Sequence, residues 1–86
     1  MFLAKIFVTL KVTVNDPQGQ TIMGGLKSLG FQNVAQVRAG KYMEIHLEED
    51  DREEAKVQLT AMCQKLLANP IIEEFHFELE VIPTSP

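Results

Sequence analysis

The sequence predicts a single α+β domain in which two helices lie on one face of an antiparallel sheet. The chain has 86 residues, a length typical of one domain. Apolar and polar residues alternate in its first and last segments, which is the period of a half-buried strand. Between these segments, two stretches repeat apolar residues every three or four positions, as amphipathic helices do. The expected order is β-α-β(β)-α-β, a ferredoxin-like arrangement.

The first strand is expected over residues 2–14. Apolar side chains occupy the even positions from Phe2 to Val14, while Lys5, Thr9 and Lys11 point the other way. Residues 15–19 then carry turn chemistry, because aspartate accepts local backbone hydrogen bonds, proline fixes φ and glycine permits positive φ. The strand should therefore end in a turn that leads to the first helix.

The remaining elements follow from the same periodicities. A helix is expected over residues 20–29, with Gly30 as its stop. Residues 34–48 are extended and interrupted by Gly40, so they form either a tight hairpin or one long, kinked strand. A second helix, capped by Asp51, ends at Asn69 before a proline, and a last strand covers residues 71–82. The domain is thus expected to span residues 1–82, with residues 83–86 as a flexible tail.

The expected strands are long for so small a domain. A compact chain of this size has a radius of gyration near 12 Å. Thirteen strand residues would span roughly 43 Å. The overhanging apolar rows then favour covering by another copy of the chain, in a homodimer or higher oligomer, over a bulge that curls each strand back. The residues expected at this oligomer interface are Leu3 and Phe7 on the polar face, and Ile72 and Ile82 opposite the acidic row of the last strand.

Composition and motifs exclude several function classes. A net charge of −4 argues against nucleic-acid binding, and no stretch has the length of a membrane span. The unpaired Cys63 and the lack of a secretory pattern at Met1 favour a cytoplasmic protein. Cys63 falls on the apolar face of the second helix, where a buried and unreactive thiol is the ordinary outcome. The residues form no catalytic or metal-binding pattern, so we expect no bound cofactor and no activity of this chain alone.

Four segments together resemble the PurS family, and the resemblance covers roughly residues 2–82. The segments are residues 16–19 (DPQG) after the long first strand, 29–31 (LGF), 37–41 (VRAGK) and 63–75 (CQKLLANPIIEEF). The resemblance implies the small, non-catalytic subunit of phosphoribosylformylglycinamidine synthase, from de novo purine biosynthesis. It implies a subunit that bridges a glutaminase subunit and a large ATP-dependent synthetase subunit, and that supports ammonia transfer. ATP and glutamine would then be used by those other subunits.

The residues expected at the interface with these partners are Asp16, Gly19, Arg38 and Lys41. Loops on a rigid scaffold commonly carry recognition, and arginine is enriched at interface hot spots. An equally weighted alternative is that Asp16 and Gly19 only shape a turn. A second function also remains open, an ACT-like regulatory module that binds a small molecule such as an amino acid. Such modules share this element order, and residues 16–19 satisfy their short D-x-x-G pattern.

Overall fold

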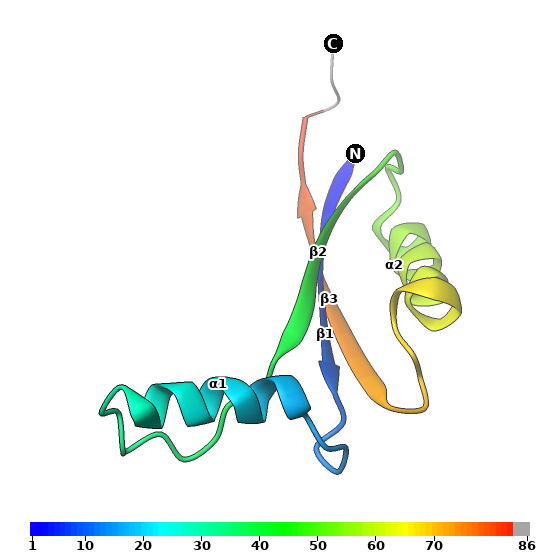
Figure 1. Ribbon diagram of the computed structural model, residues 1–86. Helices are drawn as coiled ribbons and strands as arrows, with labels where there is room; N and C mark the ends of the chain where they lie inside the picture. The colour runs from blue at the N-terminus through cyan, green and yellow to red at the C-terminus, as the bar shows by residue number, and fades with distance from the viewer. Residues whose placement is uncertain (84–86) are drawn as a thin grey trace.

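The computed structural model describes residues 1–83 and shows a three-stranded antiparallel sheet with two α-helices (Figure 1). The order β-α-β-α-β confirms the predicted α+β class. Within the described residues, no helix is both long and apolar enough to cross a membrane. The elements are β1 (Phe2–Leu10), α1 (Pro17–Ser28), β2 (Gly40–Leu47), α2 (Arg52–Met62), a short π-helical segment η1 (Cys63–Leu67) and β3 (Glu73–Val81).

The central strand of the sheet is β1, with β2 and β3 antiparallel to it on either side. The register places Ile6 opposite Met43 and Phe77, so the apolar rows of all three strands share one face. The same register places Phe7 opposite Tyr42 and His76 on the other face. Because side chains alternate along a strand, the sheet has one apolar face and one mixed face.

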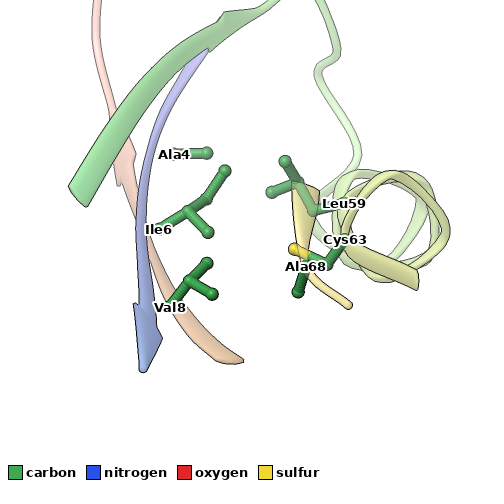
Figure 2. Close-up of a cluster of buried hydrophobic side chains, with 6 residues drawn as sticks. All are labelled: Ala4, Ile6, Val8, Leu59, Cys63 and Ala68. Carbon is green, nitrogen blue, oxygen red and sulfur yellow. The ribbon is translucent and has the colours of Figure 1, made fainter. Parts of the chain in front are cut away.

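The core lies between the apolar face and α2 (Figure 2). Ile6 and Val8 of β1 point toward Leu59 and Cys63, and all four side chains are fully buried. The helix begins where predicted, because the Asp51 carboxylate accepts a hydrogen bond from the Glu53 amide over 3.0 Å. The single turn of π-helix that follows continues the predicted second helix to Leu67.

The first helix does not lie where the sequence predicts. Figure 1 shows α1 leaving one end of the sheet and extending away from it, on the side opposite α2. The prediction of two helices on one face is therefore wrong, and only α2, with the η1 segment that continues it, covers the apolar face. The helix also begins earlier than residue 20, because Pro17 suits its first position and Asp16 caps it. Residues 29–39 run back beneath α1 without regular structure, and we call residues 17–39 the arm.

The strands are shorter than predicted. The first ends at Leu10 rather than Val14, and the last covers Glu73–Val81 rather than residues 71–82. Residues 34–39 form neither a hairpin nor part of a kinked strand, since β2 starts at Gly40. The molecule is nevertheless extended, with a radius of gyration of 16.8 Å and dimensions of 50 × 30 × 15 Å, because the arm projects. Of the predicted tail, residues 84–86 lie outside the described part of the chain.

Candidate partner-binding site

The base of the arm brings together the four residues predicted at the partner interface. Asp16 lies at the centre and is only 5% exposed. Its carboxylate accepts hydrogen bonds from the Gly19 amide over 3.0 Å and from the Ala39 amide over 2.7 Å. These two bonds hold the pKa of Asp16 below its ordinary value. One side chain thus joins the start of α1 to the end of the segment that returns to β2.

Gly19 is required at this junction by close packing. A Cβ atom built on Gly19 would lie 2.3 Å from the Val37 carbonyl oxygen and 2.7 Å from Asp16 Oδ2. A Cβ atom essentially never lies this close to a non-bonded oxygen, so any side chain here would push the two ends of the arm apart. Gly19 serves the close approach of two backbone segments within the first turn of α1.

Arg38 fastens the arm to the end of β1. Its guanidinium donates hydrogen bonds to three backbone carbonyl oxygens: Lys11 at 2.9 Å, Val14 at 3.2 Å and Leu10 at 3.4 Å. These carbonyls follow or end the strand, where the sheet no longer supplies partners. The three residues Asp16, Gly19 and Arg38 therefore hold the arm, in addition to any contact that they make with another chain.

Lys41 lies next to this junction, as the second residue of β2. Its ammonium is 3.4 Å from the Glu73 carboxylate across the sheet. Both residues line a cavity of about 220 Å³ that Asp16 also borders. The Asn69 amide, 2.7 Å from the Glu73 carboxylate, and the Lys41 ammonium lower the pKa of Glu73. The base of the arm thus presents one exposed cation beside a hydrogen-bonded acid.

The mixed face of the sheet is the second candidate surface, and we call it the open face. Phe7 lies at its centre, stacked on the His76 ring at 4.6 Å and tilted against the Tyr42 ring at 5.0 Å. Lys5 forms an ion pair with Glu80 at 3.2 Å. The three rings of Phe7, Tyr42 and His76 form an aromatic row that comes from three different strands. Alternation within one strand predicts that each of these side chains faces outward, but only the register between strands shows that they meet.

The predicted oligomer residues do not form one patch. Leu3 and Phe7 lie on the open face and are half-buried. The Ile82 amide donates to the Met1 carbonyl at one end of β3, whereas the Ile72 carbonyl accepts from the Lys11 amide at the other. Only the first pair belongs to a continuous surface.

The described residues offer no arrangement for catalysis. Within residues 1–83, no group of three or more histidine, cysteine or acidic side chains could hold a metal ion. The Cys63 thiol is buried in the core, which raises its pKa and leaves it without a nucleophilic thiolate. His46 and His76 point from the opposite face of the sheet, so neither can act as its base.

Comparison with known proteins identifies the family. A family model described as PurS, phosphoribosylformylglycinamidine (FGAM) synthase, matches residues 3–81. The chain belongs to the PurS family. It is 46% identical to the PurS subunit of Synechocystis over 91% of this chain and 78% of that protein. It is 43% identical to the PurS subunit of Bacillus subtilis over 95% of this chain and 96% of that protein.

Solved PurS structures share the fold. The Bacillus subtilis PurS structure matches with a TM-score of 0.86, covering 94% of this chain and all of that one. The Methanocaldococcus jannaschii PurS structure, 38% identical, matches with a TM-score of 0.87, covering 96% of this chain and all of that one. A chain of the Thermotoga maritima PurLQS structure matches with a TM-score of 0.82 at 27% identity, covering 93% and 99%.

Membership of the PurS family confirms the predicted role. The chain is a PurS-type subunit of FGAM synthase, a ligase of purine biosynthesis, and not its catalytic subunit. The comparisons give no support to an ACT-like module. The structure also provides a physical reason against ligand binding at the D-x-x-G pattern, because the Asp16 carboxylate already accepts hydrogen bonds from two backbone amides.

Proposed function

We propose that this PurS chain bridges the glutaminase and synthetase subunits of FGAM synthase and supports the transfer of ammonia between them. The chain itself binds no cofactor, and ATP and glutamine are used by the other two subunits. It works in the cytoplasm as a homodimer or higher oligomer. The likeness to a chain of the PurLQS structure supports association with both larger subunits.

The observation that carries this proposal is the amount of surface that the isolated chain leaves uncovered. Its accessible surface is 6100 Å². A compact monomer of 9.7 kDa would expose roughly 5,100 Å². Large apolar side chains are among the exposed ones, including Leu29 at 76% and Phe31 at 55% on the arm and Leu66 at 84% on η1. A chain whose residues 1–83 form no catalytic arrangement, yet expose such surfaces, is suited to binding other chains.

Reconstitution with the two partner subunits tests the proposal. Glutamine-dependent amidation of formylglycinamide ribonucleotide should require all three chains and be lost when this one is omitted. Amidation with added ammonium should persist without it, because the synthetase then needs no ammonia from the glutaminase. Equal glutamine-dependent rates with and without this chain would contradict the proposed role.

The base of the arm is our proposed contact with the larger subunits, through Lys41 and the neighbouring residues Asp16, Gly19 and Arg38. Lys41→Ala removes an exposed charge and should weaken co-elution with a partner subunit while leaving the fold unchanged. Arg38→Ala should weaken it as well, but it also removes three hydrogen bonds that hold the arm. Lys65→Ala on η1 is the matched control. Co-elution of the Lys41 variant at the wild-type level would exclude this surface.

A further inference from the structure

One end of the molecule gathers exposed apolar side chains and cations beside the base of the arm. At this end β1 stops, while β2, β3 and α1 all begin (Figure 1). The Lys11 amide donates to the Ile72 carbonyl over 2.9 Å, and the Lys11 carbonyl accepts from the Arg38 guanidinium. Val12 and Ile71 are next to them in the chain and are 83% and 79% exposed. We call this surface the end patch, and its residues are Lys11, Val12, Arg38, Lys41, Ile71 and Ile72.

The end patch is basic in a chain that is otherwise acidic. Its three cations and the adjacent carboxylates of Asp16 and Glu73 give a net formal charge of +1. The whole chain carries −4, so the remaining residues carry −5. The next acid along β3, Glu74, belongs to the open face, since it pairs with Thr9. An acidic surface of another chain is therefore attracted to this end and repelled by the rest of the molecule.

The carboxylates at this end have partners already, whereas two of the cations do not. Asp16 and Glu73 both accept hydrogen bonds from backbone amides, and Glu73 also pairs with Lys41. Within residues 1–83, neither Lys11 nor Arg38 forms an ion pair with a carboxylate. The Lys41 side chain remains 57% exposed. The end patch can thus receive the carboxylates of a partner without giving up a contact of its own.

The same end offers room for an apolar side chain. The cavity of about 220 Å³ at the base of the arm is lined by Val8 and Leu10 as well as by Lys41 and Glu73. Binding energy at protein interfaces is concentrated where an apolar anchor fills such a pocket. A partner that fits the end patch therefore combines carboxylates with a neighbouring apolar side chain.

The acidic run of this chain does not fit as the occupant. Residues 48–54 lie at the opposite end of the sheet, where β2 leads into α2 (Figure 1). A contact between this run in one copy and the end patch in the next is heterologous, so it repeats into a filament or a ring. The occupant that the charges favour is a different chain.

We propose that the end patch docks an acidic segment of a larger FGAM synthase subunit, in which an apolar side chain stands beside the carboxylates. The carboxylates face Lys11, Arg38 and Lys41, and the apolar side chain enters the cavity beside Lys41. This inference rests on the bridging role of the proposed function and specifies the chemistry of one contact.

Binding of the full-length chain to the glutaminase subunit, to the synthetase subunit and to both together tests the charge. Lys41→Glu should weaken binding about tenfold at low salt, measured by surface plasmon resonance, whereas Lys41→Arg should bind like wild type. Rising salt should weaken the binding of wild type but not that of Lys41→Glu. Lys56→Glu on α2 is the matched control and should bind normally. Lys56 also pairs with a glutamate over 3.4 Å and is 48% exposed.

A second pair of variants tests the apolar part. Ile71→Ser should weaken the same binding about tenfold, whereas Val57→Ser, at a 64% exposed position on α2, should not. Far-UV circular dichroism should show the same fold for all variants, because these side chains lie on the surface.

Wild-type binding by Lys41→Glu, an affinity independent of salt, or an equal loss in Lys41→Arg would overturn the inference. Filaments of the isolated chain that Lys41→Glu dissolves would overturn it as well, because the acidic run of another copy would then be the occupant. The omission assay decides the proposed function separately. Glutamine-dependent amidation that still requires this chain would retain the bridging role even if the end patch binds no acidic segment.

Discussion

Gly19→Ala should destabilise this protein, whereas the same substitution five residues further along α1 should stabilise it. The new methyl group at position 19 would lie 2.3 Å from the Val37 carbonyl oxygen. Relieving this overlap requires a backbone shift of about 1 Å, and overpacking of this kind typically costs 1–3 kcal/mol. Neither segment can move alone, because the Asp16 carboxylate bonds the Gly19 and Ala39 amides.

The net loss of free energy of unfolding is the cost of the overlap less the gain in helix propensity. Alanine is favoured over glycine inside a helix by about 1 kcal/mol. With an overlap cost of about 3 kcal/mol, at the upper end because the obstacle is backbone, Gly19→Ala should lower the free energy of unfolding by about 2 kcal/mol. Gly24 has no atom within 4 Å of a built Cβ, so Gly24→Ala should raise the free energy of unfolding by about 1 kcal/mol.

Thermal unfolding followed by circular dichroism measures the contrast. For a domain of this size, 1 kcal/mol shifts the midpoint by roughly 4–8 °C. Gly19→Ala should therefore melt about 10 °C below wild type and Gly24→Ala about 5 °C above it. All three proteins must be compared at one concentration, because self-association raises the apparent stability. Equal shifts of the same sign, or a Gly19 variant as stable as wild type, would refute the close approach of residues 19 and 37.

Three further predictions concern single side chains. The pKa of Asp16 is lowered in the folded chain, so its contribution to the free energy of unfolding is fully present above the ordinary pKa of about 3.8 and is lost as pH falls through the folded pKa. Asp16→Asn should remove that part of the dependence of stability on acid. An unchanged slope of the free energy of unfolding against pH would contradict this prediction. Leu59→Ala should lower the free energy of unfolding by about 2–5 kcal/mol because Leu59 is fully buried against β1. Leu66→Ala, at an 84% exposed position, should change it by no more than about 0.5 kcal/mol. Urea titration measures both changes, and equal losses would contradict the position of Leu59 in the core. The Cys63 thiol should react with a disulfide reagent only as the chain unfolds, since burial raises its pKa; rapid labelling of the native chain would contradict its place in the core.

Local sequence patterns were sufficient for most of the fold. Alternation over residues 2–10 and 73–81 predicts which side chains face the core, because a strand turns its side chains to opposite faces in strict order. The Asp51 cap defines the start of the second helix by local chemistry alone, whereas the helical segment ends at Leu67, two residues before the predicted stop at Asn69. Four short segments in the right order were also sufficient to identify the PurS family from the sequence.

The candidate site was less predictable. Asp16, Gly19, Arg38 and Lys41 were selected as surface recognition residues, and the structure does gather them at one end of the sheet. Asp16 and Arg38 also secure the arm, through hydrogen bonds that link residues 16 and 39 or 14 and 38, and Gly19 permits the close approach of residues 19 and 37. Contacts over more than 20 positions leave no periodic pattern in the sequence, so their structural role emerges only from the folded chain.

Some features of each element thus follow from the sequence alone, and others follow from the tertiary structure. The sequence by itself determined the positions of two helices and of three strands along the chain, and the apolar face of each strand, because these depend on neighbours a few positions away. Only the tertiary structure decided that β1 ends at Leu10, that residues 34–39 are not a strand, and that α1 leaves the sheet. The physical reason is the junction at Asp16 and Arg38, which directs an amphipathic helix away from the sheet that its apolar positions would suit.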